Sequence, residues 1–264
     1  MTSPQRTICA AALLVMAMLP FAESSDSWIA RQAIGRFQMS SEVPIRQSKV
    51  LSDFMQALRQ HESDIASILG LNLNQKPIVI NVFQSRRSYQ EFVTRIAPDG
   101  KERRALFIQS ETHGSVYVYL HADVMTDLRH ETTHAILHSS LPFIPLWLDE
   151  GLAEYFEVTR ENRASANRHL KRTKLDARLI LTWRPNLTKL ETVRDQSVMT
   201  ARNYRESWAW VHFLLHGPDA ANSMITRYLA SIEAHDPPGP LSTQLRRVWS
   251  KPERQLTSHI KSWK

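Results

Sequence analysis

The sequence feature that most constrains this chain is the run His130-Glu131-Thr132-Thr133-His134. On a helix, its two histidines lie one turn apart on the same face, about 6 Å along the helix axis. Two imidazoles at this spacing can bind one Zn²⁺ ion, and Glu131 then lies beside the metal, where its carboxylate can take a proton from a metal-bound water. The run therefore predicts a helix that carries two ligands and the general base of a metal site.

Carboxylates follow the motif at a spacing that can complete such a site. Pro142 and Pro145 end the first helix and turn the chain, and a second helix then presents Glu150 and Glu154 one turn apart. A zinc site needs a third protein ligand, and we predict Glu150 in this role. Glu154 faces the same way, so we expect it to accept the other ring N–H of a ligand histidine.

A third histidine of the first helix is excluded from the ligand set. His138 lies eight residues beyond His130, which is about 12 Å along the axis, and one metal ion cannot be reached from both ends of that span. The alternative to a metal site is a surface helix whose histidines and carboxylates face water.

Residues 1–24 have the pattern of a secretory signal peptide. Arg6 supplies a positive charge, and residues 8–18 form an apolar segment too short to span a bilayer. The alternatives are an uncleaved anchor and a cytosolic leader. The only cysteine, Cys9, lies in this segment, so the mature chain would have histidine and carboxylates as its only strong metal ligands. We expect a secreted or periplasmic protein with no transmembrane segment after signal removal.

The formal charge of +7 is consistent with association with an anionic cell envelope, and also with an ordinary charge that maintains solubility. Much of it lies in residues 160–178, a helical segment with seven lysines and arginines. No aromatic residues alternate with these charges, so we predict a solvated helix face and no nucleic-acid partner.

Hydrophobic periodicity predicts an α+β protein with one domain at residues 48–264 and a lead-in with little structure of its own at 25–47. Helices are expected at residues 48–69 and 85–96, and strands at 77–83, 105–109 and 115–120, the last two as a hairpin. A small mixed or antiparallel sheet thus occupies residues 48–122. A mainly helical half follows at 123–264, with helices near 204–216, 219–234, 242–249 and 252–263, and the motif helix lies at the junction.

Two stretches together resemble the gluzincin zinc metallopeptidases: residues 130–134 and the run Trp147-Leu148-Asp149-Glu150-Gly151-x-Ala153-Glu154-Tyr155. The sequence is most similar to short, secreted bacterial members of the peptidase-MA-like type, over about residues 75–216. The resemblance implies a thermolysin-like core, one Zn²⁺ held by His130, His134 and Glu150, and Glu131 as general base. It also implies an edge strand ahead of the motif helix that pairs with an extended peptide substrate, and residues 115–120 are the candidate.

The chain departs from the aminopeptidase members of this family in three respects. Asp149 stands where they usually have Asn, their G-x-M-E-N signature is absent, and the spacer between the second histidine and Glu150 is shorter. Aminopeptidase specificity is therefore not carried over.

Hydrolysis also needs a donor that stabilises the oxyanion. Tyr204 opens a helix some fifty residues after Glu150, which resembles the placement of the transition-state tyrosine in several gluzincins. His212 is the alternative donor, and Tyr155 is a third candidate. The alternative for Tyr204 is a packing role, which is the more frequent one for a tyrosine at the start of a helix.

Two functions are consistent with these residues. The first is a secreted or periplasmic zinc-dependent peptidase that acts on a peptide or protein. The second is an envelope binding module that retains the metal without hydrolysis. Glu131 favours the peptidase, because a binding module has no use for a base at that position.

Overall fold

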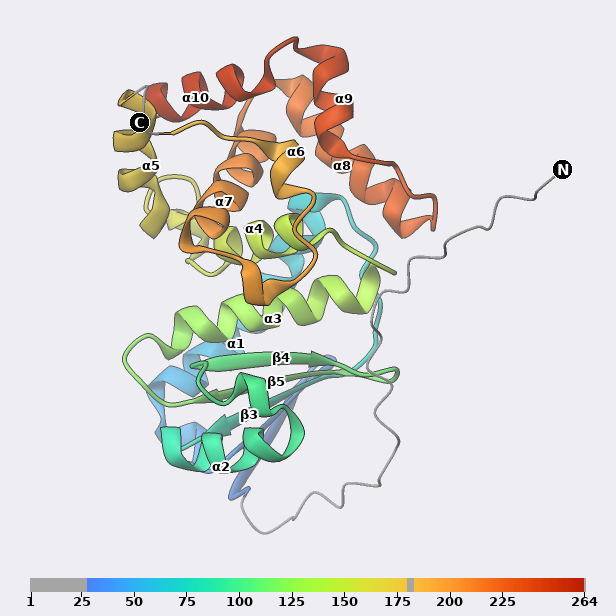
Figure 1. Ribbon diagram of the computed structural model, residues 1–264. Coiled ribbons are helices and arrows are strands. Elements are labelled where there is room, and N and C mark those ends of the chain that lie inside the picture. The colour runs from blue at the N-terminus through green and yellow to red at the C-terminus, as the bar shows by residue number, and fades with distance from the viewer. Residues whose placement is uncertain (1–27, 180–182, 264) are drawn as a thin grey trace, which may run out of the picture.

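The computed structural model describes residues 28–179 and 183–263, and over these residues the protein is α+β, with one five-stranded mixed sheet and a larger helical part. Figure 1 shows the sheet at the bottom, the helical part above it, and α3 running between them. The strands are β1 Ala30–Ile34, β2 Phe37–Ser41, β3 Ile78–Phe83, β4 Ala105–Gln109 and β5 Gly114–Tyr119. The predicted fold class is confirmed at this level. The predicted signal peptide lies outside the described residues.

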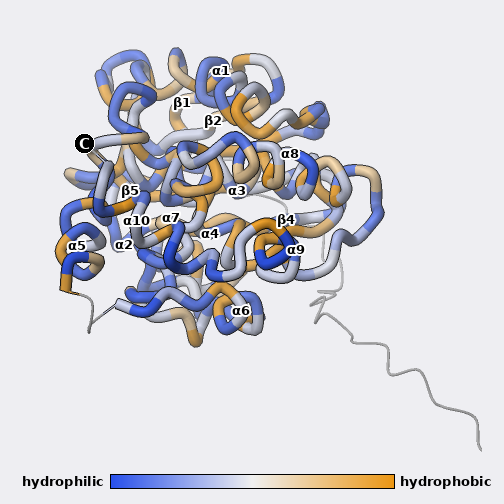
Figure 2. The backbone as a smooth tube through the Cα atoms, turned by 90° about the horizontal axis from the view of Figure 1, so that it is seen from above, coloured by the Kyte–Doolittle hydropathy of each residue, from blue (hydrophilic) through white to orange (hydrophobic). Residues whose placement is uncertain are grey.

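Most of the α-helices of these residues begin and end close to the predicted positions, but in the segment 160–178, which was predicted as helical, a 3-10 turn comes first and the α-helix begins only at Arg168. The α-helices are α1 Lys49–Leu69, α2 Arg86–Ile96, α3 Val124–Ser140, α4 Leu146–Phe156, α5 Arg168–Arg178, α6 Leu187–Leu190, α7 Ala201–His216, α8 Asp219–Glu233, α9 Leu241–Val248 and α10 Pro252–Ser262. Short 3-10 turns lie at Ile45–Gln47, Pro98–Gly100, Arg160–Asn162 and Gln196–Val198. Figure 2 shows hydrophobic and hydrophilic positions alternating along the helices, as amphipathic helices with one buried face require.

The strand order is β1-β2-β3-β5-β4, with β2, β3 and β5 parallel and a β-hairpin at each end. The hairpin of residues 105–120 is thus confirmed. However, β5 lies between β3 and β4, so the expectation that residues 115–120 form the edge strand is wrong. The edge strand beside the motif helix is β4. Its position follows from the parallel pairing of β5 with β3, which the hairpin pattern alone does not reveal.

The expectation of an unstructured lead-in at residues 25–47 is also wrong. β1 and β2 lie there, and β2 pairs in parallel with β3, from Phe37 opposite Ile78 to Ser41 opposite Val82. Phe37 and Met39 are buried, whereas Gln38 between them is exposed. This alternation is that of a strand with one face on the core.

The two faces of the sheet bury different residue types. Val116 and Val118 of β5 belong to the main core, which also includes residues of α1, α3, α4 and α7. Tyr117 and Tyr119, on the other face, pack against a small aromatic cluster around Phe83 and Tyr89. The motif helix α3 lies on the first face, against β4 and β5, and it also packs against α4 and α1. It is therefore held from several directions.

Candidate metal centre

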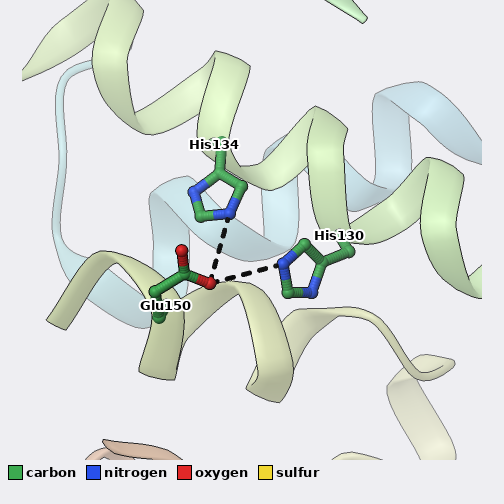
Figure 3. A group of neighbouring side chains, drawn as sticks. All are labelled: His130, His134 and Glu150. Atoms are coloured by element: carbon green, nitrogen blue, oxygen red, sulfur yellow. Dashed lines mark ion pairs between the residues drawn. The ribbon is translucent and has the colours of Figure 1, made fainter. Parts of the chain in front are cut away.

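The two motif histidines point from α3 toward one carboxylate of α4 (Figure 3). The Nε2 atom of His130 lies 3.6 Å from Oε2 of Glu150, and Nε2 of His134 lies 3.7 Å from the same oxygen. These separations are too long for hydrogen bonds. The Glu150 side chain is buried, with 2% of its surface exposed, yet its Oε2 atom has no hydrogen-bond partner. Three donor atoms thus face one point, and these residues could hold a metal ion.

Local sequence explains how Glu150 reaches this point. Leu141 ends α3 in an extended conformation (φ −100°, ψ 130°), as is usual for a residue before proline. Pro145 then precedes the first residue of α4, where a fixed φ near −65° favours helix initiation. The chain reverses within five residues, so α4 lies against α3. The other oxygen of Glu150 accepts a hydrogen bond from Gln196, which fixes the carboxylate.

The remaining ring nitrogen of each motif histidine is held by a carboxylate. Nδ1 of His130 lies 3.1 Å from Glu157, and Nδ1 of His134 lies 2.8 Å from Asp149. Because an ionised carboxylate can only accept, each Nδ1–H donates, and Nε2 of each ring faces Glu150, where a bound metal ion would replace its proton. Burial by itself would lower the pKa of His134, but Asp149 and Glu150 beside it raise the pKa to about 9. The site thus combines two oriented imidazoles with a strongly negative surrounding.

His138 is hydrogen-bonded to Asp149, but it is not one of the side chains that face Oε2 of Glu150. Its Nε2 lies 2.8 Å from Oδ2 of Asp149, whose Oδ1 accepts from His134. The three residues also form a close cluster of potential ligand atoms, but the nitrogen of His134 in that cluster is already hydrogen-bonded to Asp149. The exclusion of His138 from the site of His130, His134 and Glu150 is consistent with this arrangement.

The role expected for Glu154 is wrong. Its carboxylate accepts from Arg168 at 2.6 Å and from His169 at 2.9 Å, both on α5, and the hydrogen bonds of the motif histidines go to Glu157 and Asp149. Burial opposes ionisation of Glu154, but the His169 hydrogen bond and nearby positive charges keep its pKa well below the usual range. Glu157 was missed, although it follows Glu150 by seven residues, two helical turns along the same face.

Glu131 lines a cavity of about 760 Å³ beside the three donor atoms. The cavity is also lined by Glu150, by residues 102–105 at the start of β4, and by Tyr204 of α7. Burial raises the pKa of Glu131, although the motif histidines act in the opposite direction. Its carboxylate thus has a raised affinity for a proton and faces a space that can admit a ligand.

Tyr204 lies in the first turn of α7, which begins with a capping box between Thr200 and Asn203. The cap fixes the position of this turn, and Tyr204 lines the cavity together with Glu131. Burial, assisted by the negative charge of Glu150, raises the pKa of Tyr204 to about 12. The hydroxyl therefore stays protonated at neutral pH and can act as a hydrogen-bond donor.

The two other candidate donors lie elsewhere. His212 is fully buried, with Nδ1 2.9 Å from Nε2 of His259 and Nε2 2.9 Å from the carbonyl of Ala164. It is absent from the cavity wall, because α7 turns that part of its face toward α5 and α10. Tyr155 is buried, and its hydroxyl hydrogen-bonds Nε2 of His216. Neither side chain is placed to contact a molecule in the cavity.

Several residues of the cavity wall were not singled out from the sequence: Arg103, Arg104, Arg168, His169 and Gln196. They come from three separate segments, and no spacing rule connects them to the motif.

Within the described residues, no helix is long and apolar enough to cross a membrane.

Comparison with known proteins adds no assignment to this geometry. No protein-family model matches the sequence, and no curated protein matches it significantly.

Proposed function

We propose that the protein is a zinc-dependent peptidase of the gluzincin type. The observation that carries the proposal is the convergence of His130, His134 and Glu150 on one buried point beside Glu131. The sheet ahead of the motif helix and the third carboxylate on the next helix are consistent with a thermolysin-like core.

The spacing of the donor atoms agrees with zinc. Two ligands at about 2.0–2.1 Å from a tetrahedral ion lie about 3.4 Å apart. The separations of 3.6 and 3.7 Å from Glu150 to the two histidines are close to that value. Two nitrogens and one oxygen are a typical donor set of catalytic zinc, which leaves its fourth position for water. Zinc held there would supply a Lewis acid that polarises the scissile carbonyl and lowers the pKa of a bound water.

Glu131 and Tyr204 then have distinct tasks. The Glu131 carboxylate takes a proton from the attacking water and passes it to the leaving amine, for which a raised pKa is suited. The protonated Tyr204 hydroxyl donates to the oxygen that gains negative charge. Asp149 and Glu157 keep the two histidines in the required tautomer.

Strand β4 offers a binding edge for an extended peptide. It lies at the end of the sheet, and its start contributes to the cavity wall next to Glu131. Addition of a peptide as a sixth strand would place main-chain groups along β4 and the scissile bond in the cavity, with little dependence on side chains. We further propose that residues 1–24 direct export, so that the enzyme acts in the periplasm or outside the cell, where the basic surface permits envelope association.

The test combines metal analysis with a Glu131→Gln variant. Purified protein should contain one zinc per chain, cleave unstructured peptides, and lose activity with a chelator. The variant should retain zinc and the parent's thermal stability while cleavage falls by at least about 10²-fold. Absence of stoichiometric zinc, or equal cleavage by the variant, would contradict the proposal. Binding of an envelope partner that chelator and Glu131→Gln leave unchanged would instead favour a binding module.

A further inference from the structure

Arg103 is an exposed arginine that lines the cavity at the approach to the edge strand. It stands two residues before Ala105, the first residue of β4, in the segment of residues 102–105 that forms one wall. The same cavity is lined by Glu131 and Tyr204. Its guanidinium therefore borders the space in which a substrate would lie.

Within the described residues, Arg103 is the one cationic side chain of this cavity wall without an ion pair or a side-chain hydrogen bond. Arg104 binds Asp123 and Asp127 at 2.8 Å each. Arg168 binds Glu154 at 2.6 Å and Glu157 at 3.3 Å. The positive charges of these two neighbours are thus compensated within the protein, whereas that of Arg103 is not.

The charge of Arg103 acts on the centre of the cavity. Burial raises the pKa of Tyr204, and the positive charge of Arg103 opposes this rise. A substrate bound beside Tyr204 would experience the same positive field.

We propose that Arg103 binds a carboxylate of the substrate, so that the enzyme prefers peptides with an acidic group close to the scissile bond. This inference rests on the proposed peptidase function and specifies its substrate class. The carboxylate is either an Asp or Glu side chain or the free carboxyl terminus of a peptide. A planar guanidinium with no internal partner can form two parallel hydrogen bonds to either group.

Four of the six carboxylates of the cavity wall are each paired with an arginine: Glu102, Asp127, Glu154 and Glu157. The other two, Glu131 and Glu150, belong to the candidate metal centre. A neutral peptide would leave the Arg103 charge without a partner, and a basic one would be repelled by it. An acidic peptide paired along β4 would place its carboxylate beside the guanidinium without disrupting an internal ion pair.

The experiment measures peptide binding separately from hydrolysis. Full-length zinc-loaded protein with Glu131→Gln binds fluorescent peptides of equal length that differ only in charge. One carries Glu and an amidated terminus, one is neutral with a free carboxyl terminus, one is neutral and amidated, and one carries Lys and is amidated. We expect one of the first two to bind about tenfold more tightly than the neutral amidated peptide, and the preferred one identifies the source of the carboxylate.

Substitution of Arg103 then tests the residue itself. Arg103→Ala should abolish the preference, Arg103→Lys should retain part of it, and Arg103→Glu should shift it toward the Lys peptide. Arg247→Ala, an exposed and unpaired arginine on α9, changes the net charge equally and should leave the preference unaltered. Thermal unfolding and zinc content of each variant establish that its fold is intact.

Two results would overturn the inference. One is equal binding of all four peptides by the Glu131→Gln protein, and the other is an equal loss for all four in Arg103→Ala. The parent protein's hydrolysis of the same peptides is a separate measurement. A protein that shows the Arg103-dependent preference but cleaves nothing would contradict the peptidase function and leave the carboxylate site standing.

Discussion

Asp149 uses its two carboxylate oxygens for two different histidines. Oδ1 accepts from His134 and Oδ2 from His138, each at 2.8 Å. An asparagine has only one acceptor oxygen, so it would present an N–H group to one of the two rings. His138 thus acts on the candidate metal site through Asp149, because its hydrogen bond helps to fix the carboxylate that orients His134.

Substitutions of Asp149 and His138 should separate the direct effect of Asp149 on the orientation of His134 from the indirect effect of His138. Asp149→Asn should lower zinc affinity by about tenfold or more, because partners of ligand histidines commonly contribute 10–100-fold. His138→Gln should have a smaller effect in the same direction. Competition with a chromogenic chelator measures both. His235→Asn, on the exposed surface, is the control, and unchanged affinity in Asp149→Asn would refute the assigned role.

Tyr204→Phe removes only the hydroxyl of a side chain that lines the cavity. If this group stabilises the oxyanion, kcat should fall by about 10²-fold, while KM and zinc content stay near the parent values. Tyr155→Phe removes a buried hydroxyl outside the cavity wall and serves as the comparison. Equal kcat values for the parent and Tyr204→Phe would assign the donor to another group.

The metal-facing residues could be predicted because their geometry is local. The spacing of His130 and His134, and the turn before Glu150, suffice to bring them together. The error at Glu154 arose from a distant segment, because Arg168 and His169 of α5 bind that carboxylate. No local pattern indicates that a helix fourteen residues later competes for it.

At the scale of elements, the contact between α4 and α7 holds the site together. α4 carries Glu150, and the first turn of α7 carries Tyr204. Gly151 permits their close approach: a Cβ atom at this position would lie 2.7 Å from the Ser207 carbonyl oxygen of α7. The oxygen belongs to the backbone, so it cannot move without shifting the helix.

Gly151→Ala should therefore separate α4 from α7. We expect a loss of about 1–3 kcal/mol in the free energy of unfolding, from the forced repacking, together with weaker zinc binding. Urea denaturation and chelator competition provide the two measurements. In Gly239→Ala the added Cβ meets no atom within 4 Å but φ is +72°, so this variant shows the cost of backbone strain alone. A Gly151→Ala protein as stable as the parent would disprove the packing argument.

Elements with strong periodicity, such as α1, were predicted to within a residue, because Ser48 and Gly70 provide an N-cap and a left-handed C-cap. The β1–β2 hairpin was missed because its five-residue strands are largely polar and exposed on β1. The hairpin is stabilised through the pairing of β2 with β3, which places Phe37 opposite the distant residue Ile78. The order of strands in the sheet likewise depends on long-range pairing that residue patterns do not specify.

At the scale of the whole molecule, buried neutral histidines link folding to pH. Burial lowers the pKa of His61 and that of His212 to about 3. The Thr133 hydroxyl donates to the carbonyl of Arg129, so it accepts from Nε2 of His61, whose Nδ1 is buried without a partner. Protonation of either ring in the folded protein would bury an uncompensated charge, so the unfolded chain, with a pKa near 6.5, takes up the proton first.

The stability contributed by these neutral rings is complete above pH 6.5 and is lost as the pH falls from 6.5 toward 3. At pH 5 each ring should lower the free energy of unfolding by about 2 kcal/mol relative to neutral pH. His212→Asn should flatten the decline between pH 7 and pH 5, measured by urea denaturation in chelator so that metal release does not contribute. His235→Asn should keep the parent's decline. A His212→Asn protein with the parent's full pH dependence would count against this assignment.

The closeness of the three candidate ligands in sequence bears on the order in which the site forms. His130, His134 and Glu150 fall within 21 residues, on two consecutive helices. Closing so short a loop costs little chain entropy, so these side chains can come together before the distant strands pair. Tyr204, Gln196 and the β4 wall join them only when the remaining chain has folded. The two helices thus bring the candidate ligands together early, and the later contacts with α7 fix their geometry and complete the cavity.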